Sequence, residues 1–324
     1  MRVAGSTVLV LGGAGFIGSH LVDMLVERGV RHVTVVDTLW LGRLENLSHA
    51  TASGNVIFVK ENAEDYSALR EVIGRTPYDV VFNLATRPLA YSFHDPRGSY
   101  MTSVNIAANL AELLRAQAYG HLVHFSTSEV YGDAVQTPMS ETHPLHPTTP
   151  YAAGKAAADH LIQSYVTLFD VPVLTVRPFN NYGPRQNDGD YAAVIPLTIR
   201  RILASEPPIL EGSGTQTRDF TFVRDTARIT IQLLECEAAW GQTLNIAAAQ
   251  EVPIGHLINT IARVMSYTGS ILARPVRPGD HRRHLADASS ARALVTFDPL
   301  TPLDEGLAAT VEYFRRRAQP LTTS

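Results

Sequence analysis

Short apolar runs alternate with longer amphipathic stretches through the first half of the chain. The runs have the length of buried strands, and the stretches between them repeat apolar residues at helical spacing. This alternation indicates βαβ units, and therefore an α/β fold with a doubly wound parallel sheet that is covered on both faces. The pattern predicts strands over residues 7–11, 32–37, 56–59, 80–84, 122–126 and 173–176, and helices over residues 17–28, 66–73, 104–118 and 152–168.

The pattern changes after about residue 180, where prolines and glycines indicate irregular connections between shorter elements. Regularity returns in a predicted strand over residues 243–247 and a predicted helix over residues 254–265. We predict that residues 1–180 form the sheet domain, and that a segment of about residues 220–250 returns to it. Residues 181–324 then form mainly a smaller lobe, with a ligand cleft between the two parts.

Composition narrows the possible function classes. The chain has 324 residues, of which 45% are hydrophobic and 18% charged, as is ordinary for a globular protein. Its formal net charge is -4, whereas a general nucleic-acid binder needs an excess of basic residues. Cys236 is the single cysteine, so no intramolecular disulfide can form, which fits a reducing cytoplasm. No run is long and apolar enough to cross a bilayer. We therefore expect a cytoplasmic protein without nucleic-acid or membrane partners.

A glycine-rich turn lies between the first predicted strand and the first predicted helix. Small residues at this spacing let the backbone turn tightly, let a pyrophosphate approach, and let the helix pack close to the sheet. The amides and the dipole at the start of the helix then stabilise the phosphate charge. The turn predicts dinucleotide contacts at Gly12, Gly15, Phe16, Ile17 and Gly18.

Asp37 ends the second predicted strand, about twenty residues after the turn. A carboxylate at this place accepts hydrogen bonds from ribose hydroxyls and repels a 2′-phosphate, so it favours NAD over NADP. Arg43 lies near enough in sequence to weaken that preference. Residues after the third and fourth predicted strands are placed to border the adenine ring, namely Asn62, Ala63, Leu84 and Ala85.

Three residues predict a proton-transfer site. Thr127 follows the fifth predicted strand, and Tyr151 and Lys155 lie four residues apart at the start of the next helix, on one helix face. An ammonium group near a phenol favours the phenolate and lowers the phenol's pKa. Such a tyrosine can remove a hydroxyl proton while hydride leaves for nicotinamide, and Thr127 can hydrogen-bond the same substrate oxygen.

Together these motifs resemble the extended short-chain dehydrogenases/reductases, which include sugar-nucleotide epimerases, dehydratases and decarboxylases. The resemblance implies a Rossmann-type fold with a smaller C-terminal substrate lobe, NAD as cofactor and a nucleotide-diphosphate sugar as substrate. It also implies a homodimer formed through the helices at 104–118 and 152–168. The matching segments are residues 12–18, 126–132, 151–155, 177–185 and 218–220, in order along nearly the whole chain.

The resemblance also implies roles for residues outside the two motifs. Pro178 is expected to border the cofactor, and Asn180 to contact the sugar-phosphate part of the substrate. Arg218 and Arg282 are expected to hold the diphosphate, and guanidinium forks do suit phosphate geometry. No metal site is expected, because the histidines near Arg282 have no carboxylate–cysteine cluster beside them.

Members of this group first oxidise the sugar at C4 and differ in the next step. Dehydratases place an Asp-Glu pair directly after the catalytic Thr, so that the Glu removes the C5 proton and the Asp protonates the departing C6 hydroxyl. Here those positions hold Ser128 and Glu129, so the base is present while the acid is replaced by a poor proton donor. Decarboxylation of a C6 carboxylate needs no such acid, because the C4 ketone makes the substrate a β-keto acid.

We therefore favour decarboxylation of UDP-glucuronate to a UDP-4-keto-pentose or UDP-xylose. Arg87 or Arg185 could hold the substrate carboxylate, although a phosphate contact or an exposed position explains Arg87 equally well. Dehydration of an NDP-hexose and 4-epimerisation of UDP-glucose or UDP-glucuronate are the alternatives. A non-catalytic dinucleotide sensor would be expected to lose Tyr151 or Lys155, and this chain has both.

Overall fold

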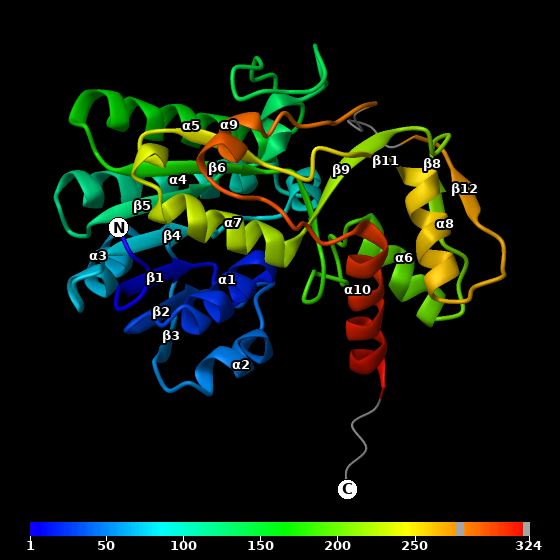
Figure 1. The fold of residues 1–324 in the computed structure, drawn as a ribbon, viewed down its shortest axis with the longest axis horizontal. Coiled ribbons are helices and arrows are strands. Elements are labelled where there is room, and N and C mark those ends of the chain that lie inside the picture. Colours follow the sequence, from blue (N-terminus) through cyan, green and yellow to red (C-terminus); the bar gives the residue numbers. More distant parts are fainter. Residues whose placement is uncertain (277–281, 320–324) are drawn as a thin grey trace, which may run out of the picture.

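The computed structural model of the chain describes residues 1–276 and 282–319. Within them, a seven-stranded parallel sheet has the strand order β10-β6-β5-β4-β1-β2-β3 (Figure 1). The predicted α/β fold with a Rossmann-type doubly wound sheet is confirmed. The strands are β1 (Thr7–Leu11), β2 (His32–Asp37), β3 (Val56–Lys60), β4 (Val80–Asn83), β5 (His121–Phe125), β6 (Val173–Pro178) and β10 (Thr243–Ile246).

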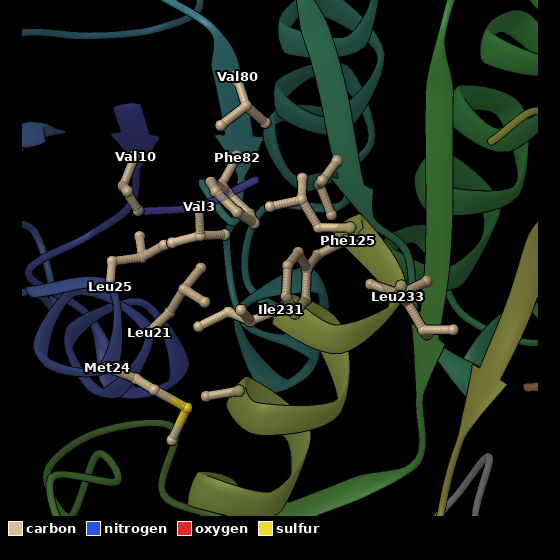
Figure 2. Packing of buried hydrophobic residues seen from close by; sticks show 14 of the residues in the cluster. Val3, Val10, Leu21, Met24, Leu25, Val80, Phe82, Phe125, Ile231 and Leu233 are labelled. Carbon is tan, nitrogen blue, oxygen red and sulfur yellow. The ribbon is translucent and has the colours of Figure 1, made fainter. Parts of the chain in front are cut away.

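Helices bury apolar side chains against both faces of this sheet. One face is covered by α1 (Phe16–Glu27) and α7 (Val223–Glu235), whose leucines and isoleucines pack against Phe82 and Phe125 of the strands (Figure 2). The other face is covered by α3 (Tyr66–Gly74), α4 (Pro96–Arg115) and α5 (Pro150–Phe169). Truncating one such buried leucine or isoleucine to alanine costs about 2–5 kcal/mol of stability.

Capping residues decide where α4 and α5 begin. Asp95 accepts a hydrogen bond from the Gly98 amide at 2.8 Å, and Pro96 follows it, so α4 begins eight residues before the predicted position 104. Thr149 accepts from the Ala152 amide at 3.2 Å, so α5 begins at Pro150. This start places Tyr151 in the first turn of α5.

A smaller lobe packs at one end of the sheet, on the right in Figure 1. Its core contains Ile195, Phe220, Leu257 and Leu307, all buried. Its helices are α6 (Val194–Leu203), α8 (Ile254–Val264) and α10 (Leu303–Ala318), and its strands are β7 (Asn180–Tyr182), β8 (Ile209–Glu211), β9 (Thr217–Phe222), β11 (Glu251–Pro253) and β12 (Leu272–Arg274). The remaining helical elements are α2 (Ser48–Thr51), α9 (Ser289–Leu294), η1 (Leu44–Leu47), η2 (Leu89–Phe93), η3 (Ser128–Tyr131) and η4 (Glu237–Ala239).

The carboxyl ends of the parallel strands and the facing side of the small lobe enclose a cleft of about 680 Å³. In open α/β sheets, ligands bind at this edge. Across the described residues, every helix is too short or too polar to span a membrane.

Candidate active site

The glycine turn between β1 and α1 lines the cleft. Gly12 has a φ of 75°, and a Cβ there would lie 2.8 Å from the Ala85 amide nitrogen. A Cβ on Gly18 would collide with the Gly12 carbonyl oxygen. Both positions therefore require glycine, which brings the backbone of the turn close to any ligand at the start of α1. This geometry fits a pyrophosphate.

Asp37 at the end of β2 is held beside the turn by backbone amides. Its carboxylate accepts hydrogen bonds from Leu39 at 2.8 Å and from Ala14 at 3.1 Å. Burial raises the pKa of Asp37, and these amides oppose the rise. Arg43, the residue that could favour NADP, lies 3.8 Å from Asp188. The Asp37 carboxylate lines the cleft where ribose hydroxyls would approach.

The rest of the predicted cofactor site lies along the same wall. Asn62 accepts a hydrogen bond from the Glu64 amide at 3.0 Å, and the Ala63 carbonyl accepts one from Asn109 at 3.0 Å. These contacts fix the backbone after β3, the segment that is predicted to border the adenine ring. The predicted cofactor residues Gly12, Gly15, Phe16, Ile17, Gly18, Asp37, Asn62, Ala63, Leu84, Ala85, Tyr151, Lys155 and Pro178 all line one cleft.

Tyr151 is hydrogen-bonded at the centre of the cleft. Although Tyr151 is partly exposed to the cleft, burial raises the pKa of Tyr151 to about 12. The hydrogen bonds with the Thr127 and Thr86 side chains oppose this rise, and the charge of Glu129 adds to it. The predicted lowering of the Tyr151 pKa by Lys155 is therefore wrong for the protein alone.

Lys155 lies one helical turn beyond Tyr151, and its Nζ donates to the Phe125 carbonyl at 2.8 Å. Burial lowers the pKa of Lys155 to about 8, while the negative charge of Asp159 raises it. Asp159 in turn accepts hydrogen bonds from Ser126 Oγ at 2.8 Å and from Arg177 Nε at 2.9 Å. The buried Asp159, held by Ser126 and Arg177, thus favours the charged form of Lys155.

Three further residues of the site were not predicted from the sequence, namely Thr86, Asp159 and Arg177. Thr86 follows the end of β4, and a polar residue just beyond a strand end was the available clue. Asp159 lies four residues after Lys155, a spacing at which opposite charges meet on a helix. Arg177 lies inside the apolar strand β6, where a buried arginine requires a partner.

Five of the six predicted substrate residues line the cleft. These are Arg87, Ser128, Asn180, Arg185 and Arg218. Ser128 is buried directly after Thr127, and Glu129, predicted as the catalytic base, also lines the cleft. Asn180 donates to the Asp219 carbonyl at 3.4 Å, and the buried Arg218 donates to the Thr217 carbonyl at 2.8 Å. A guanidinium fixed in this way suits a diphosphate.

The other three predicted arginines differ from Arg218. Arg87 lines the cleft, but its guanidinium carbon lies 4.3 Å from the centre of the Trp40 ring. Arg282 is exposed, and the described residues that line the cleft do not include it. Its backbone carbonyl accepts from Thr217. Arg185 lines the cleft but forms an ion pair with the buried Asp23 at 2.7 Å.

A glycine turn, an acidic residue at the end of β2 and a Thr-Tyr-Lys group at the carboxyl edge of a parallel sheet define the class. They are the features of a short-chain dehydrogenase/reductase with an added substrate lobe. More specifically, the chain belongs to the GDP-mannose 4,6 dehydratase family, whose profile matches residues 9–310. The predicted membership among sugar-nucleotide epimerases, dehydratases and decarboxylases is confirmed.

Relatives with three different reactions match nearly the whole chain. A UDP-glucose 4-epimerase of Mycolicibacterium smegmatis is 35% identical over 313 residues, which cover 96% of this chain and 99% of that protein. UDP-glucuronic acid decarboxylase 2 of Arabidopsis thaliana is 33% identical over 98% of this chain and 70% of its own. A structure of a Streptomyces venezuelae dTDP-glucose 4,6-dehydratase with NAD bound has a TM-score of 0.90 and 27% identity, covering 96% of this chain and 97% of that one. The family therefore modifies sugar nucleotides, and similarity alone does not select the reaction.

Proposed function

We propose that this protein binds NAD in its cleft and oxidises a nucleotide-diphosphate sugar at C4, as a 4-epimerase of neutral UDP-hexoses. In this proposal, residues 1–180 hold the cofactor, with residues 220–250 returning to that domain, and residues 181–324 mainly hold the sugar nucleotide. The proposal is supported by the fact that the glycine turn, Asp37, the Thr127–Tyr151–Lys155 group and Arg218 all line the same cleft.

The residues of the cleft can perform the proton transfers. Tyr151 accepts the C4 hydroxyl proton, and the hydroxyls of Thr127 and Thr86 stabilise the phenolate that does so. Lys155, fixed by the Phe125 carbonyl, adds positive charge on the same helix face. When bound, oxidised NAD would supply the hydride acceptor. Arg218 holds the diphosphate, and the C4 ketone can then be reduced on its other face.

One observation carries the choice of epimerisation: among the described residues, a serine stands where a dehydratase has its acid, and both arginines that could hold a substrate carboxylate have other partners. Ser128 occupies the position at which a dehydratase has its acid. Both arginines considered for a substrate carboxylate line the cleft but already have a partner: Arg87 lies over the Trp40 ring, and Arg185 pairs with Asp23. We therefore rank decarboxylation, which the sequence alone favoured, below epimerisation.

A second candidate rests on Glu129. This carboxylate lines the cleft close enough for its charge to raise the pKa of Tyr151. A carboxyl group at this place can remove the C5 proton in a dehydration, or deliver a proton to C5 after CO2 has left in a decarboxylation, and epimerisation requires neither step. Dehydration or decarboxylation is accordingly the second proposal, and Glu129→Gln separates the two. If the protein is an epimerase, this variant should retain turnover. If it is a dehydratase or decarboxylase, the variant should lose turnover.

The test is a product survey with NAD in deuterium oxide. UDP-glucose, UDP-galactose, UDP-N-acetylglucosamine, dTDP-glucose and UDP-glucuronate are each incubated with the protein and followed by NMR and mass spectrometry. We expect conversion between the C4 epimers of a UDP-hexose, with unchanged mass and no solvent deuterium in the product. Loss of water with deuterium uptake, or loss of CO2 from UDP-glucuronate, would contradict the epimerase and support the second proposal.

We also propose a homodimer formed through α4 and α5. The two helices pack on each other, and their outer residues leave large apolar side chains exposed. Tyr100 and Met101 on α4 are each 37% exposed, and Leu168 and Phe169 on α5 are 73% and 44% exposed. Light scattering after gel filtration measures the mass in solution, and a monomer at micromolar concentration would contradict the proposal.

A further inference from the structure

Aromatic rings from three separate segments of the chain meet beside the cleft. Trp40, after β2, stacks on Tyr191 with ring centroids 5.7 Å apart and ring planes at 25°. Tyr91 of η2 contacts both rings edge-on, at 4.8 Å and 5.6 Å. Arg87 completes the group over the Trp40 ring. Trp40 and Tyr191 both line the cleft, and we call the contact between them the aromatic clasp.

The segment that carries Tyr191 is tied to both parts of the molecule. Asp188 lies 3.8 Å from Arg43 of the cofactor side and 3.0 Å from Arg317 of α10. Arg185 pairs with Asp23 of α1. The segment between β7 and α6 therefore crosses the cleft and is attached to the sheet domain as well as to the small lobe.

The backbone has a positive φ on both sides of the aromatic clasp. Leu39, directly before Trp40, has a φ of 59°, and Tyr191 itself has a φ of 68°. Residues with a side chain rarely adopt this left-handed region, and such positions gather at ligand clamps. Both loops thus hold an unfavourable conformation at the point where they touch.

The clasp lies beside the predicted pyrophosphate site. The loop that carries Trp40 is fixed to the glycine turn, because the Arg43 amide donates to the Ala14 carbonyl at 3.0 Å. Asn46 donates to the same carbonyl at 2.9 Å. Trp40 is also only three residues beyond Asp37, where the ribose would bind.

We propose that Trp40 and Tyr191 close over the ribose and pyrophosphate of NAD and keep the reduced cofactor bound throughout the reaction. This inference rests on the proposed function. Oxidation moves the C4 hydrogen as hydride to the cofactor and the hydroxyl proton to Tyr151, and reduction returns both to the same ketone. If the reduced cofactor leaves between these steps, the cycle ends with a free ketone and free NADH. A redox-neutral enzyme therefore needs a barrier to cofactor release, and the clasp supplies it.

The test measures NAD retention by Trp40→Ala and Tyr191→Ala. We expect each variant to release bound NAD about tenfold faster than the wild type, the amount that loss of one aromatic contact predicts. During turnover each variant should also accumulate free NADH and keto-sugar, which a purely structural defect would not produce. Tyr191→Phe keeps the ring and should restore slow release. Release at the wild-type rate from both alanine variants would overturn the inference, as would equally fast release from Tyr191→Phe.

Tryptophan fluorescence provides a second measurement, because the chain contains only Trp40 and Trp240. Trp240 packs against His121, and the described lining of the cleft does not include it. NAD should quench the emission of Trp240→Phe and leave that of Trp40→Phe unchanged; the reverse pattern would overturn the inference. Absence of NAD binding by the wild type would instead refute the proposed function, so the wild type is measured first.

Discussion

The two sides of the cleft are formed in different ways. On the cofactor side the backbone defines the shape, because a Cβ at Gly12 or Gly18 would meet main-chain atoms. On the substrate side the shape depends on which partner each side chain takes, as with Arg87 on Trp40 and Arg185 on Asp23. The difference indicates that the cofactor side sets the chemistry common to the family, while the substrate side selects the reaction. The predictions below test this division.

Tyr151→Phe should have the largest effect. It removes the proton acceptor but keeps the ring, so turnover should fall by about 10²- to 10⁴-fold while NAD affinity stays nearly unchanged. Steady-state kinetics and titration calorimetry measure the two quantities. Tyr66→Phe, on the exposed start of α3, is the matched control. Full turnover by Tyr151→Phe would remove the tyrosine from the mechanism.

Gly18→Ala should weaken NAD binding by about 10- to 100-fold, because the new methyl group displaces the turn. The control is Gly74→Ala, where a Cβ meets no atom within 4 Å. Calorimetry gives the affinities, and the thermal midpoint reports any loss of folding. If Gly18→Ala bound NAD as the wild type does, backbone shape would not define the cofactor side.

Asp37→Ser should change the cofactor preference by about tenfold towards NADP, since the carboxylate no longer repels a 2′-phosphate. Comparing kcat/KM for the two cofactors measures the change. Asp65→Ser is a matched control, because Asp65 caps α3 and does not line the cleft. An unchanged preference would mean that Asp37 acts only on the amides of Ala14 and Leu39.

Asp159→Asn should have the smallest effect, on the pH profile. The charge of Asp159 raises the Lys155 pKa, which burial holds at about 8, so its removal should lower that pKa further. Lys155 would then lose its proton at lower pH, and the alkaline decline of kcat should move down by roughly one pH unit. Ser126→Ala removes a hydrogen bond to Asp159 without removing the charge, and serves as control. If the alkaline decline of kcat stayed at the wild-type pH in Asp159→Asn, Asp159 would not set the Lys155 pKa.

Much of the cofactor side could be predicted from the sequence because few residue types fit there. The glycines of the turn and Asp37 occupy positions that strand and helix order alone locate. The start of α4 was missed because an Asp-Pro cap extends the helix beyond its apolar repeat. The short strands of the small lobe were also missed, since three-residue strands such as β7 and β8 carry too little pattern to detect.

The properties of the site residues were harder to predict than their positions. Spacing placed Tyr151 and Lys155 on one face, but burial, which depends on the folded structure, reversed the expected direction of the Tyr151 pKa. The environments of Arg87, Arg185 and Arg282 could not be predicted from the sequence either. Their charge was evident from the sequence, while their partners and exposure depend on residues distant along the chain.

The most direct test of the central claim is the fate of a deuterium at C4 of UDP-glucose. If Tyr151 and NAD oxidise C4 and the same cofactor returns the hydride, NMR should show UDP-galactose with the deuterium still at C4 and no label in the solvent. Deuterium at C6 with loss of water would show dehydration and contradict the epimerase. Unreacted UDP-glucose and UDP-galactose, with conversion of UDP-glucuronate instead, would contradict the choice of a neutral hexose.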